Sequence, residues 1–276
     1  MKTLHVNGAD IPVIGLGTWT LRGDACVDLV RHGIDIGYRH IDTAASYENE
    51  AEIGEAIRNS RVERSEVFVT TKVWWTNLSA SDLLRSAESS LQRLRLDYVD
   101  LLLVHWPNPE FPLHETMDAL SRLRERGLTR HIGVANFPTS LLAEAVRVSP
   151  VPLVANQVES HPYLDQRKIH EACRMYGMAM VAYCPLHRGG SLLEEEPIRA
   201  AAVRHGKTPG QIVLRWHIQQ ENVAAIPRTS RKERLAENID VFDFMLDDDE
   251  MEVIGSLRSE GRRICDYDFS PQWDEP

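Results

Sequence analysis

The chain has 276 residues, of which 43% are hydrophobic, and it carries a formal net charge of -10 at pH 7. This length and apolar content are enough for one large domain with a sizeable core, so we expect a single domain over residues 1–276. The negative charge argues against a nucleic-acid groove or an anionic membrane surface as the partner.

The four cysteines, Cys26, Cys173, Cys184 and Cys265, are scattered without Cys-x-x-Cys spacing. This distribution is typical of reduced thiols in a cytoplasm rather than of a disulfide framework or a zinc site. The first residues become polar too early for a signal peptide. No apolar run approaches the roughly 20 residues of a membrane span. We therefore expect a cytoplasmic protein that has no membrane partner.

The chain opens with a hairpin signal, in which apolar residues flank the turn pair Asn7-Gly8. Short runs rich in Val, Ile and Leu then alternate with amphipathic stretches of about 10 to 15 residues. The runs end at Gly17, Asp42, Lys72, His105, Asn136, Gln157, Tyr183 and Pro227-Arg228. Such repeats predict an α/β fold, a (β/α)8 TIM barrel preceded by a β-hairpin. An open doubly wound sheet would need a break in the pattern or a linker, and the sequence has neither.

Four polar residues stand where catalytic groups of such a barrel lie, at the C-terminal ends of strands. Asp42, Lys72 and His105 end apolar runs, and Tyr47 lies in the loop after the second strand. Each alone has an ordinary explanation as a helix cap, a solvated strand end, a core histidine or a packing tyrosine. Together they suit carbonyl reduction. We expect the Lys72 ammonium to lower the pKa of the Tyr47 phenol and Asp42 to keep that ammonium charged. The phenol then protonates the alkoxide that forms from a carbonyl, while His105 orients its oxygen.

With these four residues in place, the sequence resembles the aldo-keto reductase family, and most of all its bacterial 2,5-diketo-gluconate reductase-like members. The resemblance covers nearly the whole chain and rests on these motifs: Gly15-Leu16-Gly17-Thr18-Trp19, His40 to Tyr47, Thr71-Lys72-Val73-Trp74, His105-Trp106-Pro107, Gly133 to Phe137, Asn156 to Glu159, His161-Pro162-Tyr163, Ala182-Tyr183 and Ile226-Pro227. It implies a catalytic tetrad of Asp42, Tyr47, Lys72 and His105, with Tyr47 as the proton donor. It further implies a monomeric enzyme that reduces an aldehyde or ketone.

The resemblance also implies a nicotinamide cofactor that lies extended across the barrel rim, since Gly15-x-Gly17 alone is weak evidence for a dinucleotide site. Asn136 and Gln157 would hold the carboxamide, and Tyr183 would stack on the nicotinamide ring. The other implied cofactor contacts are Gly17, Thr18, Asp42, Pro185, Leu186 and Pro227, with Arg228, Thr229 and Arg234 at a 2′-phosphate and Glu237 and Asn238 near the adenine.

The segment from Arg228 to Asn238, after the last strand, favours NADPH over NADH as the cofactor. Its cations, hydroxyls and helix amides make a suitable anion site, although a solvated basic helix end is the simpler explanation. The sequence departs from the family pattern at three places. Arg228-Thr229 stands where Lys-Ser is commoner, Ala135 replaces a serine, and Cys184 follows Tyr183 where serine is common. NADH therefore remains possible as a weaker cofactor.

Three tryptophans, Trp19, Trp74 and Trp106, follow strand ends and with His105 are expected to bind the substrate. They would form an aromatic wall suited to partly apolar carbonyl compounds. The loops after His105 and Tyr183 are expected to be modest in length, which indicates an open pocket. The tail from Arg262 to Phe269, with Trp273, resembles family tails that fold over the barrel mouth; a surface strap is the alternative.

Two other functions remain open. His40-x-Asp42 could be a metal pair of a barrel hydrolase, because residues two apart on a strand share a face. The other strand ends carry Lys72, Asn136 and Gln157 instead of further ligands, so we expect no metal. The second alternative is a non-enzymatic, nicotinamide-binding regulatory subunit, against which the intact tetrad argues.

Overall fold

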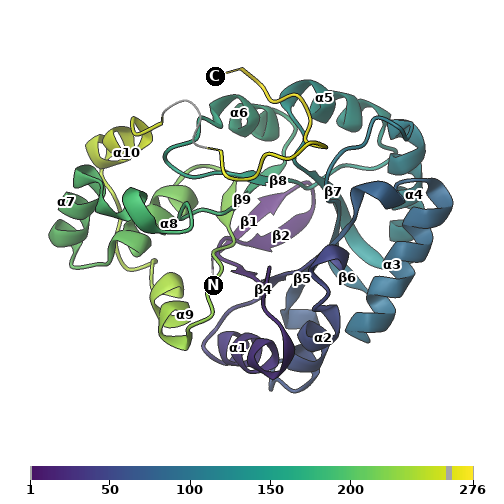
Figure 1. The fold of residues 1–276 in the computed structure, drawn as a ribbon, viewed down its shortest axis with the longest axis horizontal. Coiled ribbons are helices and arrows are strands. Elements are labelled where there is room, and N and C mark those ends of the chain that lie inside the picture. Colours follow the sequence, from purple (N-terminus) through teal and green to yellow (C-terminus); the bar gives the residue numbers. More distant parts are fainter. Residues whose placement is uncertain (1, 259–262, 276) are drawn as a thin grey trace.

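The structure is a computed structural model that describes residues 2–258 and 263–275. Eight parallel strands form one sheet in the order β10-β9-β8-β7-β6-β5-β4-β3 (Figure 1). They are β3 Leu16–Gly17, β4 His40–Asp42, β5 Phe68–Val73, β6 Val99–Val104, β7 Thr129–Ala135, β8 Ala155–Glu159, β9 Ala179–Tyr183 and β10 Val223–Ala225.

The two edges of this sheet meet. Parallel bridges join Ile14 to Ala225 and Gly17 to Arg228, so the strands close into a ring. Gly17 allows this approach, because a Cβ atom there would lie 2.8 Å from the Ile226 carbonyl oxygen. The predicted (β/α)8 barrel is confirmed.

Helices surround the barrel, and most of them connect one strand to the next (Figure 1). The connecting helices are α1 Gly23–Asp35, α2 Glu50–Arg58, α3 Ala80–Leu94, α4 Leu113–Glu125, α5 Thr139–Val148, α6 Arg167–Met175 and α8 Pro209–Gln219. Helix α9 Lys232–Ile239 follows the last strand, β10. Short 3-10 turns lie at η1 Ala45–Tyr47, η2 Arg64–Glu66, η3 Trp75–Asn77 and η4 Gly190–Glu194. Helix α8 starts as a capping box predicts: the Thr208 hydroxyl accepts from the Gln211 N–H, and the Gln211 side chain accepts from the Thr208 N–H.

Two further helices, α7 Glu196–His205 and α10 Asp248–Gly255, lie outside the strand–helix repeat. Ile198 and Ala201 of α7 pack with Leu246 and Ile254 in a separate apolar cluster. The connection after β9 therefore includes η4 and α7 before α8 begins. The expectation of a modest loop after Tyr183 is wrong, since the short apolar face of α7 gave no clear helical pattern.

The N-terminal hairpin of β1 Thr3–Val6 and β2 Ala9–Pro12 is confirmed. Asn7 and Gly8 have φ values of 44° and 82°, as a two-residue turn of this kind requires. The Asn7 side-chain amide donates to the carbonyl oxygens of Leu153 at 2.7 Å and Tyr176 at 2.9 Å. These residues precede β8 and β9, so the hairpin closes the N-terminal end of the barrel (Figure 1).

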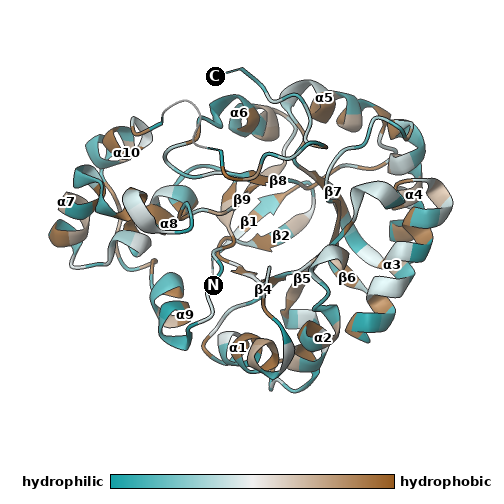
Figure 2. Ribbon diagram, viewed as in Figure 1, coloured by the Kyte–Doolittle hydropathy of each residue, from teal (hydrophilic) through white to brown (hydrophobic). Residues whose placement is uncertain are grey.

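The core has two layers, because successive strand residues point to opposite faces. Leu101 and Leu103 face the barrel interior with Val6 and Ile11 of the hairpin. Leu102 belongs to the second layer, between strands and helices. Figure 2 shows the hydrophobic colour gathered on the strands and on the inner sides of the helices. In the part of the chain described, no helix has the length and apolar character to cross a bilayer.

Candidate active site

Lys72, near the end of β5, is the centre of the site, and its side chain is fully buried. Its Nζ atom donates to Asp42 Oδ1 at 2.6 Å, to the Thr43 carbonyl oxygen at 2.8 Å and to Tyr47 Oη at 3.2 Å. An ammonium group has three N–H donors, and here each has an acceptor. The buried charge is thus both paired and hydrogen-bonded, as a stable buried ion requires.

Asp42 connects this group to the opposite wall of the barrel. Its Oδ2 atom accepts a hydrogen bond of 2.7 Å from the side-chain amide of Gln157. Asp42 ends β4 as expected, whereas β8 continues beyond Gln157 to Glu159. The prediction that the sixth barrel strand, β8, ends at Gln157 is wrong by two residues, because the following Val158-Glu159 still pairs with β9.

Tyr47 lies in η1 and holds its proton tightly. Burial raises the pKa of the phenol well above 10, and the negative charge of Asp42 raises it further. This direction is opposite to the one expected from Lys72 alone, because burial and the carboxylate outweigh the ammonium. Burial also lowers the pKa of Lys72, while Asp42 acts against that decrease. Tyr47 is therefore protonated at neutral pH, as a proton donor must be.

His105 follows β6 and completes the tetrad. Its Nδ1 atom lies 3.4 Å from Ser46 Oγ, and its ring makes edge contacts with Tyr47 and Trp74. Burial, and then the charge of Lys72, lower the pKa of His105 well below 6.5. The imidazole is neutral at pH 7, so it has one N–H donor and one acceptor nitrogen. The structure thus brings together the four residues that the sequence indicated.

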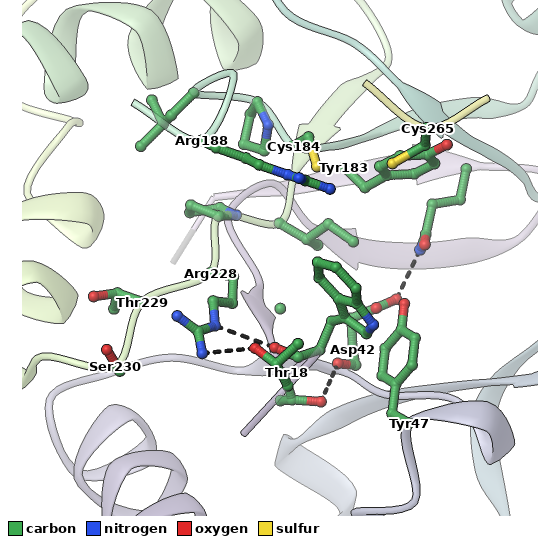
Figure 3. A pocket seen from close by; sticks show the side chains of 18 of the residues that line it. Thr18, Asp42, Tyr47, Tyr183, Cys184, Arg188, Arg228, Thr229, Ser230 and Cys265 are labelled. Atoms are coloured by element: carbon green, nitrogen blue, oxygen red, sulfur yellow. Dashed lines mark hydrogen bonds between the residues drawn. The ribbon is translucent and has the colours of Figure 1, made fainter. Parts of the chain in front are cut away.

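A cavity of about 900 Å³ opens beside these residues at the C-terminal rim (Figure 3). Most of the expected cofactor residues line it: Gly17, Thr18, Asp42, Asn136, Gln157, Tyr183, Pro185, Leu186, Pro227, Arg228, Thr229, Arg234 and Asn238. Glu237 does not; it instead pairs with Arg234 at 2.7 Å. Tyr47 lies at one end of the cavity, here named the catalytic end, and Arg228 and Thr229 lie at the other (Figure 3). His105 also lines the cavity, with its ring against Tyr47.

Asn136 has the left-handed backbone φ of 63°, and its side chain ties three strand ends together. Its Nδ2 atom donates to the His105 carbonyl oxygen at 2.9 Å, and its Oδ1 atom accepts from the Tyr183 hydroxyl at 2.7 Å. These bonds hold Tyr183 along the cavity wall, where a flat ring can pack on it.

The far end of the cavity is basic. Arg228 donates to the Trp19 carbonyl oxygen at 3.1 Å and to Thr20 Oγ1 at 2.7 Å, which fixes its guanidinium group. Arg231 and Arg234 line the same end, next to the start of α9. Guanidinium groups and a helix N-terminus together suit a phosphate group.

Aromatic residues cover the catalytic end. The ring centroid of Phe269, in the tail, lies 5.7 Å from that of Trp74 and 5.5 Å from that of Trp106. The ring centroid of Tyr267 lies 5.7 Å from that of Trp106. Cys265, Tyr267 and Phe269 of the tail thus lie at the mouth as expected, whereas Arg262 is outside the described residues. The cavity is consequently more covered than the open pocket that we expected.

Trp19 is not part of this wall, although it lines the cavity. It is 47% exposed, and the guanidinium of Arg188 lies 5.5 Å from its ring centroid. Arg188 was not predicted to line the cavity, because it belongs to the segment after β9 and gives no strand or helix signal. The only sequence feature that could have indicated a place at the cavity is its position beside Gly189-Gly190, in a basic loop after a strand end.

Glu159 is the second residue whose role was missed. Its carboxylate accepts the backbone N–H groups of Ile264 at 2.6 Å and Cys265 at 2.7 Å, and it contacts His161 Nε2 at 2.9 Å. Glu159 therefore fastens the tail to the end of β8. The partners lie about 105 positions further along the chain, so no local pattern predicts them.

The residues of the metal-pair hypothesis have other partners. His40 Nε2 lies 3.1 Å from Thr70 Oγ1 and its Nδ1 lies 3.4 Å from the Pro12 carbonyl oxygen, while Asp42 binds Lys72 and Gln157. Within residues 2–258 and 263–275, no group of three or more His, Cys, Asp or Glu side chains is gathered to hold a metal ion.

A TIM barrel whose rim holds a tyrosine backed by a buried Lys–Asp pair, beside a neutral histidine, defines an oxidoreductase that acts on carbonyl groups. Comparison with known proteins agrees. The profile of the aldo/keto reductase family matches residues 13–259. The chain belongs to this family.

Its relatives cover almost its full length. Methylglyoxal reductase DkgB of Salmonella typhi is 39% identical over 267 residues, which are 96% of this chain and 99% of that protein. A solved structure described as a candidate 2,5-diketo-D-gluconic acid reductase B superposes with a TM-score of 0.97 at 40% identity, covering 100% and 98% of the two chains. The aldo-keto reductase of Bombyx mori in complex with NADP has a TM-score of 0.86 at 33% identity, covering 93% and 92%.

Proposed function

We propose that the protein reduces aldehydes or ketones to alcohols, with NADPH as the hydride donor and Tyr47 as the general acid. The observation that carries this proposal is the position of Lys72 Nζ, within hydrogen-bond distance of both Asp42 Oδ1 and Tyr47 Oη. When bound, NADPH supplies a hydride to the carbonyl carbon. The chain's own residues bind the carbonyl oxygen and protonate it.

The carbonyl oxygen would lie between Tyr47 and His105. Neutral His105 donates an N–H to that oxygen and orients it, while the Tyr47 hydroxyl transfers its proton as negative charge develops. The phenolate that remains faces the Lys72 ammonium, which is 3.2 Å away. Asp42 keeps this ammonium in place, and Lys72 thus stabilises Tyr47 after proton transfer although it does not lower its resting pKa below 10.

The cavity lining fits NADPH. Arg228, Thr229 and Arg234 offer donors for a 2′-phosphate at the basic end. At the catalytic end, Gln157 uses its Nε2 atom on Asp42, so its Oε1 atom is left to accept from a carboxamide. Tyr183, fixed by Asn136, offers its ring to the nicotinamide. NADH lacks the 2′-phosphate and would bind more weakly.

The relatives' names point to small dicarbonyl compounds as substrates, namely methylglyoxal and 2,5-diketo-D-gluconic acid. The aromatic wall of Trp74, Trp106 and Phe269 suits partly apolar carbonyl compounds as well. We further propose that the chain acts as a single-domain monomer in the cytoplasm. The described cysteines are all free thiols, in keeping with a reducing compartment.

A carbonyl panel tests this function. Purified protein is mixed with NADPH or NADH and with methylglyoxal, 2,5-diketogluconate or an aromatic aldehyde, and the loss of nicotinamide absorbance is followed. We expect oxidation of NADPH with at least one of these compounds. If both cofactors bind but neither is consumed with any carbonyl compound, the regulatory-subunit alternative replaces the reductase.

A further inference from the structure

The tail that covers the cavity carries a cysteine whose position is fixed by the barrel. Glu159, at the end of β8, accepts the backbone N–H of Cys265 at 2.7 Å and that of the preceding Ile264 at 2.6 Å. Cys265 itself is 8% exposed and lines the cavity. Its place therefore depends on the barrel as well as on the tail.

A second cysteine lies at the same edge of the cavity. Cys184 directly follows β9 and has a left-handed backbone with φ of 49°, which turns the chain at the strand end. Tyr183, which precedes it, pairs with Glu159 in the sheet, and Glu159 holds the backbone of Cys265, so the two cysteines lie at neighbouring strand ends. Figure 3 shows both residues on the side of the cavity that also holds Tyr183 and Arg188. Cys184 is partly exposed, so small solutes in the cavity reach the pair.

The surroundings make the two thiols unequal. Interaction with the Cys184 thiol lowers the pKa of Cys265 although burial opposes it, and Tyr267 and the Arg188 charge act in the lowering direction. The interaction with Cys265 and then burial raise the pKa of Cys184. Cys265 is thus the better thiolate. By contrast, Cys26 and Cys173 are buried and do not line this cavity, so solutes in it do not reach their thiols.

We propose that Cys184 and Cys265 are a peroxide-sensitive pair, and that their disulfide fastens the tail across the mouth of the cavity. In the first step the Cys265 thiolate attacks one oxygen of hydrogen peroxide. The O–O bond breaks, hydroxide leaves and takes up a proton as water, and Cys265 becomes a sulfenic acid. Cys184 then attacks the Cys265 sulfur. The S–S bond forms, the S–O bond breaks, and the leaving hydroxide takes the Cys184 proton as a second water.

The disulfide would act on the part of the chain that covers the catalytic end. Tyr267 and Phe269 follow Cys265 closely and line the cavity, and Tyr183 precedes Cys184. A covalent bond between the two segments would hold the tail against β9, so that the mouth no longer opens for exchange of ligands. This consequence rests on the proposed reductase function, whereas disulfide formation does not.

Mass spectrometry of the full chain tests the pair. Reduced protein is treated with a small excess of hydrogen peroxide, remaining thiols are alkylated, and peptides are mapped. We expect a chain lighter by two hydrogen atoms, a Cys184–Cys265 linked peptide and alkylated Cys26 and Cys173. Cys173→Ala should still form the link, whereas Cys184→Ser and Cys265→Ser should not. In Cys184→Ser, a sulfenic-acid trap should label Cys265.

A link between other cysteines, or only unlinked oxidation products, would overturn the proposal. Labelling of Cys184 in Cys265→Ser, without labelling of Cys265 in Cys184→Ser, would contradict the order of the two steps. Turnover is measured separately: oxidation should lower NADPH consumption by about tenfold, and a dithiol reductant should restore it. Unchanged turnover of fully linked protein would refute the closure of the mouth. No turnover in either redox state would instead count against the reductase function.

Discussion

The Lys72 ammonium lies 2.6 Å from the Asp42 carboxylate, and both side chains are almost completely buried. Breaking such a pair leaves one charge without a partner in the protein interior. Lys72→Met should therefore destabilise the fold by roughly 3–5 kcal/mol and abolish reduction. The measurement is urea-induced unfolding of the variant and the wild type.

A double variant separates charge burial from packing. Adding Asp42→Asn to Lys72→Met removes the unpaired charge, so part of the lost stability should return although activity does not. Arg147→Met is the matched control, because its pair with Glu144 is exposed, and it should change stability by less than about 0.5 kcal/mol. If the double variant is as unstable as the sum of the single variants, the two charges are not coupled.

The basic end of the cavity predicts cofactor preference. Arg234→Gln and Arg228→Gln should each raise the KM for NADPH by about tenfold, since each removes a charge-assisted hydrogen bond to a phosphate. The KM for NADH should change little. Initial rates with both cofactors test this, with the exposed Arg199→Gln as the control. Equal increases for NADPH and NADH would show that these arginines do not bind a 2′-phosphate.

Burial of His217 should make the stability of the folded protein sensitive to acid. It is fully buried, with its Nε2 atom 3.3 Å from the Pro185 carbonyl oxygen, and burial lowers its pKa to about 3. The unfolded chain takes up a proton near pH 6.5, whereas the folded chain does not until near pH 3. Its contribution to stability is thus present above about pH 6.5 and decreases as the pH falls towards 3, by about 1.4 kcal/mol per pH unit.

Unfolding free energies at two pH values test this contribution. Between about pH 7.5 and pH 5, His217→Gln should lose roughly 2 kcal/mol less than the wild type. The exposed His114→Gln should behave like the wild type. An identical loss in wild type and His217→Gln would mean that other groups cause the acid sensitivity.

The contacts of Phe269 lead us to expect that the tail contributes to substrate binding. Its ring stacks on Trp75 with centroids 4.9 Å apart and meets the edges of Trp74 and Trp106. Phe269→Ala should raise the KM for an aromatic aldehyde by about fivefold, the equivalent of one aromatic contact, and affect the small methylglyoxal less. Phe242→Ala, on the surface, is the control. An unchanged KM for the aromatic aldehyde would indicate that the tail only covers the surface.

The barrel and the tetrad were predictable because their signals are local. Each strand end shows the apolar run and the polar residue that follows it, as at Asp42 and Lys72, and the parallel topology then gathers these ends at one rim. The turn at Asn7-Gly8 and the helix cap at Thr208 are likewise indicated by residues that are close together in the sequence.

The remaining features depend on contacts between distant segments. The hydrogen bond from Gln157 to Asp42 crosses the barrel, and Glu159 binds the tail about 105 residues later. The pKa of Tyr47 depends on how deeply the phenol is buried, which no motif reveals. That Cys184 and Cys265 line the same cavity similarly appears only when the tail is placed over the rim.

The role of Tyr47 as proton donor is tested most directly by the rate of NADPH oxidation with methylglyoxal by Tyr47→Phe, with NADPH affinity measured in parallel by fluorescence. Removing the hydroxyl should reduce kcat by about 10²–10⁴-fold, because the alkoxide loses its acid, while NADPH still binds with wild-type affinity. A Tyr47→Phe enzyme that reduces the carbonyl at the wild-type rate would contradict the assignment of Tyr47 as the general acid.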